Sequence, residues 1–172
     1  MTRTRQPEVW LRGPVPGIPA LLQPVAHSLL QCREELRACV SDLSPNEIWA
    51  RPSGAGSIGF HVRHAAGSLE RLFTYARGER LSPVQQAALA AEAQPDPAPD
   101  IGVTLLATFD QVVETALEQL RSTGDATLIE PRAVGRAQLP STVLGLLFHA
   151  AEHAQRHVGQ VATTRQVLRQ DA

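Results

Sequence analysis

Five of the six histidines in this 172-residue chain fall into two short windows. His61 and His64 lie in the first window, and His149, His153 and His157 follow one another at intervals of four residues in the second. On an α-helix, residues four apart share one face with about 6 Å between them, which suits two imidazoles that hold one metal ion. A neighbouring helix supplies the third ligand in metal sites of this kind. The sequence therefore predicts a three-histidine metal site between two helices.

The competing interpretation is that these histidines are ordinary surface or core residues, as a single histidine usually is. The run of three favours a metal, because it is set among the small residues Ala150, Ala151 and Ala154, and several imidazoles on one packed face would cost desolvation unless something coordinates them. In the first window, periodicity leaves two alternatives open. With Ile58 at the centre of the apolar stripe, His61 lies about 60° and His64 about 120° away, which favours His61 as the inward residue.

Apolar spacing predicts the elements that carry these histidines. Residues 1–16 read as a flexible lead-in, and residues 17–172 as a single domain. Alternating apolar steps of three and four predict an all-α four-helix bundle with one short extra helix. The expected long helices cover 18–43, 57–77, 101–122 and 140–168, and the short one covers 82–93. A turn or short capped helix is expected at 44–47, and a short edge strand is an option at 127–129.

Bulk properties exclude several classes of protein. The net charge is -1 and aromatic residues make up 4% of the chain, so nothing indicates nucleic-acid binding. No run approaches the roughly 18 apolar residues of a membrane span, so a cytoplasmic protein without membrane contact is expected. Cys32 and Cys39 are about 10 Å apart along one helix, too far for a disulfide, and read as small buried residues.

Two segments resemble the signatures of the DinB/YfiT-like family. Residues 57–68, SIGFHVRHAAGS, have a capping serine, then a hydrophobic residue, and a histidine seven positions after the cap. Residues 153–160, HAQRHVGQ, resemble the family's closing His-x-x-x-His-x-Gly-Gln motif. Carried over by motif position, the resemblance implies that His64, His153 and His157 are the metal ligands.

The other polar residues of these segments then have supporting roles. His61, His149 and Gln160 become candidates to support the ligands or to line the pocket, while no catalytic residue is assigned. Glu70 and Glu152 are the nearest carboxylates in sequence. Glu152 is expected to pair with Arg156 at the next turn of the helix.

Three neutral imidazoles leave a divalent ion with open coordination positions. Histidine-only ligation suits Zn or Ni first, with Co and Mn as alternatives. The resemblance implies a metal-dependent enzyme acting on a small molecule in stress or detoxification. It would be either an S-transferase using a low-molecular-weight thiol such as bacillithiol or mycothiol, or a hydrolase. The resemblance also implies a homodimer. The alternatives are a non-catalytic bundle that uses metal for stability or ligand sensing, and a plain bundle without metal.

Overall fold

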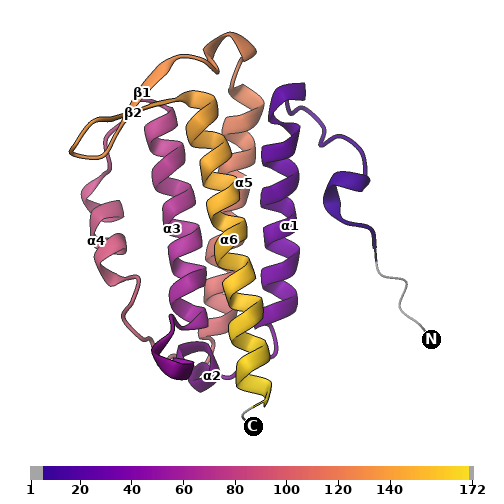
Figure 1. The fold of residues 1–172 in the computed structure, drawn as a ribbon, viewed down its shortest axis with the longest axis vertical. Helices are drawn as coiled ribbons and strands as arrows, with labels where there is room; N and C mark the ends of the chain where they lie inside the picture. Colours follow the sequence, from indigo (N-terminus) through magenta and orange to yellow (C-terminus); the bar gives the residue numbers. More distant parts are fainter. Residues whose placement is uncertain (1–5, 171–172) are drawn as a thin grey trace.

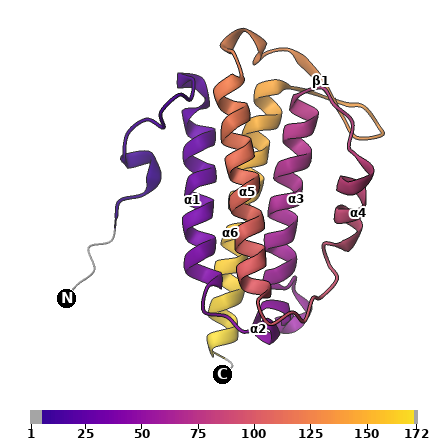
Figure 2. The same ribbon diagram turned by 180° about the vertical axis from the view of Figure 1, so that it is seen from behind.

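Four long helices lie side by side in the computed structural model, which describes residues 6–170 (Figure 1). They are α1 (Gln23–Val40), α3 (Ile58–Ala76), α5 (Ile101–Ser122) and α6 (Val143–Gln170). Two shorter helices are α2 (Pro45–Trp49), at one end of the bundle, and α4 (Pro83–Ala91), which runs beside α3 (Figure 2). The predicted all-α four-helix bundle with a short extra helix is confirmed.

The bundle is held together by one core to which all four long helices contribute. Its largest fully buried side chains include Leu29 on α1, Leu69 on α3, Phe109 on α5 and Leu147 on α6. Helices α3 and α6 form the most extensive contact between any two elements. The two histidine windows are therefore on neighbouring helices.

The N-terminal residues that the structure describes pack along α1. A 3-10 turn at Val9–Leu11 buries Val9, whose backbone N–H donates to Gln31 Oε1 at 3.0 Å. A second 3-10 turn, Ala20–Leu22, leads into α1, and Pro24 lies in the first turn of that helix. Residues 1–5 of the predicted lead-in lie outside the described part of the chain.

A two-stranded antiparallel hairpin connects α5 to α6 and was not predicted. Strand β1 (Pro131–Val134) pairs with β2 (Leu139–Thr142), with Pro131 opposite Thr142. The hairpin is fixed to the end of α3 by Arg132, whose Nε donates to the carbonyl of Ala76 at 2.8 Å.

The hairpin corrects two predictions. The strand option at 127–129 was wrong: Asp125–Thr127 form a 3-10 turn, and Leu128 is apolar because it is buried in the core. The last helix begins at Val143 and not at residue 140, because residues 139–142 form β2. Thr142 Oγ1 accepts the Gly145 N–H at 3.0 Å and satisfies a free donor in the first turn.

The short capped segments agree with the sequence. Ser44 and Glu47 form a reciprocal capping box that begins α2, and Ser82 and Gln85 do the same for α4. Among the described residues, no helix combines the length and the apolar character needed to cross a membrane.

Candidate metal centre

Helix α3 brings His61 and His64 to the face that packs against α6. Ser57 begins the helix, because its side-chain oxygen accepts the Phe60 N–H at 3.2 Å. His61 is 7% exposed, whereas the His64 side chain is 24% exposed, so the two rings differ in their access to solvent. The position of His64 at the edge of the core leaves its ring open to a ligand from solution.

Helix α6 supplies the remaining histidines from successive turns. Small or medium apolar residues, Ala150, Ala154 and Val158, are buried between them and allow close packing of the helix. His153 and His157 are partly buried, and their rings lie 4.7 Å apart between centroids. The spacing of four residues thus places two imidazoles on one face, as the sequence predicted.

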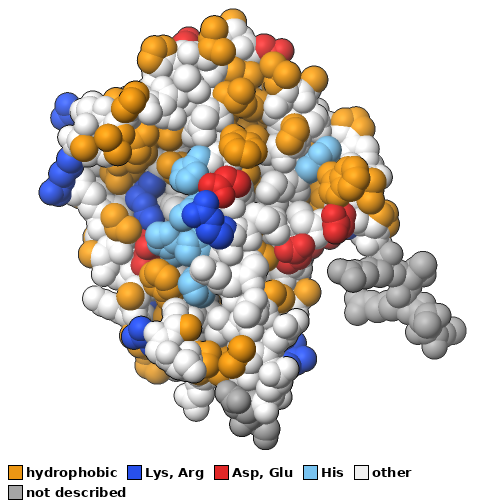
Figure 3. All heavy atoms as spheres, viewed as in Figure 1, with side chains coloured by type: hydrophobic (Ala, Val, Ile, Leu, Met, Phe, Trp, Pro, Cys, Tyr) orange, Lys and Arg blue, Asp and Glu red, His pale blue; other side chains and the backbone are white. Residues whose placement is uncertain are grey.

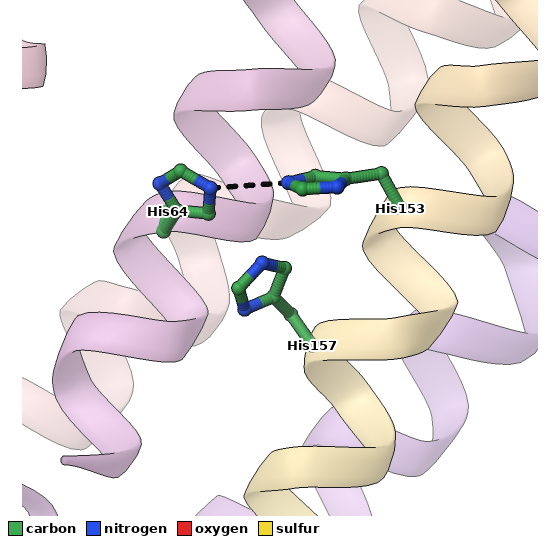
Figure 4. Close-up of side chains that lie close together, drawn as sticks. All are labelled: His64, His153 and His157. Atoms are coloured by element: carbon green, nitrogen blue, oxygen red, sulfur yellow. Dashed lines mark hydrogen bonds between the residues drawn. The ribbon is translucent and has the colours of Figure 1, made fainter. Parts of the chain in front are cut away.

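His64, His153 and His157 form a compact triad. One ring nitrogen from each of the three residues lies within 4.8 Å of the others. The Nε2 atoms of His64 and His153 are 3.0 Å apart, and the ring of His157 lies 4.6 Å from that of His64 between centroids. Figure 4 shows the three rings converging from α3 and α6 on one space.

The outer nitrogens of two triad rings have hydrogen-bond partners. His64 Nδ1 lies 2.7 Å from Glu92 Oε2, and His157 Nδ1 lies 3.0 Å from His61 Nδ1. The Nδ1 atom of His153 is buried and has no hydrogen-bond partner within residues 6–170. Partners of this kind set the ring orientation and the tautomer of metal-binding histidines.

Burial lowers the pKa of two of the triad histidines, His153 and His157. Desolvation, together with the neighbouring charges of His64, His153, His61 and Arg156, lowers the pKa of His157 to about 4. The pKa of His153 is lowered by the same two causes, burial first and then nearby cationic groups. Both imidazoles are therefore neutral at pH 7 and have a lone pair available for coordination.

The donor set fits a divalent metal ion. The triad offers three imidazole nitrogens as donors, and no carboxylate or thiol belongs to the group among the described residues. Three donors from two helices leave part of the coordination sphere to other molecules, unlike a closed structural site with four protein ligands. Nitrogen-only ligation suits Zn, Ni, Co or Mn and does not suit Mg or Ca, which prefer oxygen.

The site reaches the molecular surface. Figure 3 shows histidine side chains gathered in one area near the middle of the face formed by α3 and α6, with acidic and arginine side chains beside them. Phe60, which is partly buried, stacks on His64 with 5.5 Å between ring centroids. A small molecule entering this area would meet both the triad and an aromatic wall.

The structure places the three supporting candidates differently. His61 is in direct contact with the triad through His157. His149 is half-exposed, with Nδ1 2.6 Å from Glu152 Oε1, and its ring centroid lies 5.5 Å from that of His153. Gln160 is exposed, and its side chain makes no hydrogen bond within the described residues.

Sequence reasoning missed the carboxylate that contacts the site. Glu70 lies near Gln85, and Glu152 pairs with Arg156 as predicted, but neither touches the triad. Glu92 contacts the triad through His64, from the segment that follows α4 and 28 positions along the chain. No local signal identifies it, because its contact depends on how α4 packs beside α3.

Comparison with known proteins agrees with this arrangement. A family model described as the DinB superfamily matches residues 28–161, which include α3, α5 and most of α1 and α6. None of the curated proteins compared with the chain matches it.

Proposed function

This chain belongs to the DinB superfamily, and we propose that His64, His153 and His157 bind one divalent metal ion, Zn or Ni in the first place, as the centre of an enzyme acting on a small molecule. The observation that carries the proposal is the convergence of three imidazole nitrogens within 4.8 Å of one another. The lowered pKa values of His153 and His157 support it, because imidazoles that resist protonation are available to a metal.

The reaction we propose is thiol S-transfer or hydrolysis in stress or detoxification. When bound, the ion supplies Lewis-acid chemistry, which lowers the pKa of a thiol or water that reaches an open coordination position. The histidines would hold the ion between α3 and α6, on the side of the contact where the His64 ring is accessible to solvent. Phe60 supplies an apolar side to the entrance.

The chain's own cysteines are unsuited to act as the transferred thiol. Burial, with the negative charge of Glu35, raises the pKa of the Cys32 thiol to about 12, and its Sγ donates to Gln155 Oε1 at 3.1 Å in the contact between α1 and α6. Burial also raises the pKa of Cys39. A thiol for S-transfer would therefore come from a separate low-molecular-weight cofactor of the bacillithiol or mycothiol type.

Metal analysis tests the site. Protein purified without a histidine tag is expected to bind about one Zn²⁺ per chain. His157→Ala should lose that binding, while His27→Ala should retain it, because His27 lies on α1 and contacts the carbonyl of Gly13. Full occupancy in His157→Ala would refute the site.

Turnover tests the activity. The zinc-loaded protein is expected to accelerate conjugation of a low-molecular-weight thiol with an electrophile such as monochlorobimane, and His153→Ala to abolish the acceleration. Two results together would contradict the enzyme and favour a non-catalytic metal-binding bundle. They are the absence of turnover with every thiol tested and with hydrolysable esters, and a melting temperature that falls sharply on chelation.

A further inference from the structure

Glu92 has a buried carboxylate that contacts both His64 and Arg71. The residue is 6% exposed, and its two oxygens are used separately. Oε2 lies 2.7 Å from His64 Nδ1, and Oε1 accepts from Arg71 Nη1 at 2.7 Å. Arg71 is itself 8% exposed. Every atom of the carboxylate that can accept a hydrogen bond is therefore engaged inside the protein.

Stability alone does not explain this arrangement. A buried ion pair loses in desolvation about as much as it gains in attraction, and apolar residues of the same size are often as stabilising. Arg71 Nη1 donates to Oε1, and a guanidinium is always charged and can only donate, so its partner Glu92 is the hydrogen-bond acceptor in this pair.

The local sequence leaves room for this pair. A Cβ atom on Gly67 of α3 would lie 2.6 Å from both Arg71 Nη1 and Glu92 Oε1. Glu92 also lines a cavity of about 520 Å³ between α3, α4 and α5, which does not include the triad. Glu92 thus contacts both that cavity and His64, and the absence of a side chain at position 67 leaves space for its pair with Arg71.

An acceptor at Nδ1 determines the state of the other nitrogen of His64. Because the carboxylate that pairs with Arg71 accepts hydrogen bonds, His64 Nδ1 is the donor to it, and the lone pair that His64 can offer to a metal is then on Nε2. Nε2 is the atom that lies 3.0 Å from His153 Nε2, on the side of the triad. Glu92 contacts the opposite edge of the ring and is therefore not a ligand of the same ion.

We propose that Glu92, held by Arg71, is a positioning residue that fixes His64 as the Nδ1–H tautomer and aims its Nε2 lone pair at the metal. This role rests on the proposed metal site. It ties the segment after α4 to the metal centre, so that the triad requires the packing of α4 against α3 as well as the α3–α6 contact.

Zinc affinity of the full-length chain tests the role, measured by competition between metal-free protein and a chromophoric chelator. Glu92→Gln is expected to weaken Zn²⁺ binding about 10- to 100-fold, the usual effect of losing a carboxylate behind a ligating histidine. Glu70→Gln is the matched control, because Glu70 lines the same cavity and does not contact a triad histidine. Its affinity should equal that of the wild type.

A second variant covers the case in which Glu92→Gln does not fold. Gly67→Ala retains every functional group and suits a helix, but its methyl group displaces the Glu92–Arg71 pair. It is also expected to weaken zinc binding. Equal affinities in Glu92→Gln and Glu70→Gln, or in Gly67→Ala and the wild type, would overturn the proposal while leaving the metal site intact.

The tautomer of His64 provides a readout that does not depend on bound metal. Long-range proton–nitrogen correlation spectra of the metal-free wild type are expected to show His64 protonated at Nδ1, with the signal assigned by its loss in His64→Asn. A proton on Nε2 instead would overturn the role of Glu92. A wild-type chain without zinc affinity would overturn the proposed function, and the positioning role with it.

Discussion

His61 and His157 face each other through their Nδ1 atoms, which lie 3.0 Å apart and connect α3 to α6 beside the triad. One of the two nitrogens must donate and the other accept. When His157 Nδ1 donates, its lone pair is on Nε2. The histidine that periodicity favoured as the inward residue is therefore a partner of a triad histidine, and His64 completes the triad.

Loss of the His61 ring should weaken the site without removing it. In His61→Ala, His157 keeps its nitrogen donors but loses the partner that restrains its ring, so the dissociation constant for Zn²⁺ should rise about tenfold. Chelator competition measures this change, with His27→Ala as the control. Complete loss of zinc binding would indicate that His61 is a ligand. An unchanged dissociation constant would show that His61 does not support the site.

Acidification should destabilise the metal-free protein at pH values above those at which carboxylates titrate. The pKa of His157 is lowered to about 4, so the unfolded chain, with an ordinary histidine pKa of about 6.5, binds more protons between these values. Stability is therefore present above about pH 6.5 and is lost as pH falls toward about 4. The lowered pKa values of His61 and His153 act in the same direction.

Thermal melts in the presence of a chelator measure this dependence. The melting temperature of the wild type should fall as the pH is lowered from about 7 to about 5. The fall should be smaller in His157→Asn, because this variant lacks one imidazole whose pKa is lowered by folding. Identical slopes in the two proteins would show that His157 is protonated as easily in the folded as in the unfolded state.

The sequence predicts the placement of the α6 histidines well and that of the α3 histidines less well. His153 and His157 follow from a spacing of four residues, which is a local property of one helix. The choice between His61 and His64 depends on how far α3 is rotated toward α6, and periodicity alone favoured the other residue. The family motif pointed to His64, which the structure places with His153 and His157.

Features that depend on contacts between distant segments could not be predicted from the sequence. Glu92 and Arg71 are 21 positions apart and meet only because α4 lies beside α3. The hairpin was missed for a related reason, since strands of four residues with two prolines, Pro131 and Pro140, have no alternating apolar pattern. The four long helices were predictable because each has its own apolar stripe.

Neither cysteine should react quickly in the folded protein. The pKa of Cys32 is raised to about 12 by burial, and the residue is 0% exposed, so almost no thiolate is available to a reagent. Cys39 is partly exposed and should be modified before Cys32. Mass spectrometry after iodoacetamide treatment, with and without denaturant, compares the two sites. Modification of native Cys32 at the rate of the denatured chain would contradict the described packing.

The start of α3 should matter both for stability and for the metal centre. Ser57→Ala removes the oxygen that accepts the Phe60 N–H, and the free energy of unfolding should fall by about 1 kcal/mol. The first turn of α3 carries Phe60 and His61, so fraying there should also loosen the partner of His157. Ser41→Ala is the matched control, because Ser41 is exposed at the end of α1. Urea unfolding and zinc competition on both variants test the coupling: a Ser57→Ala protein that is less stable yet binds zinc as the control does would separate the cap from the site.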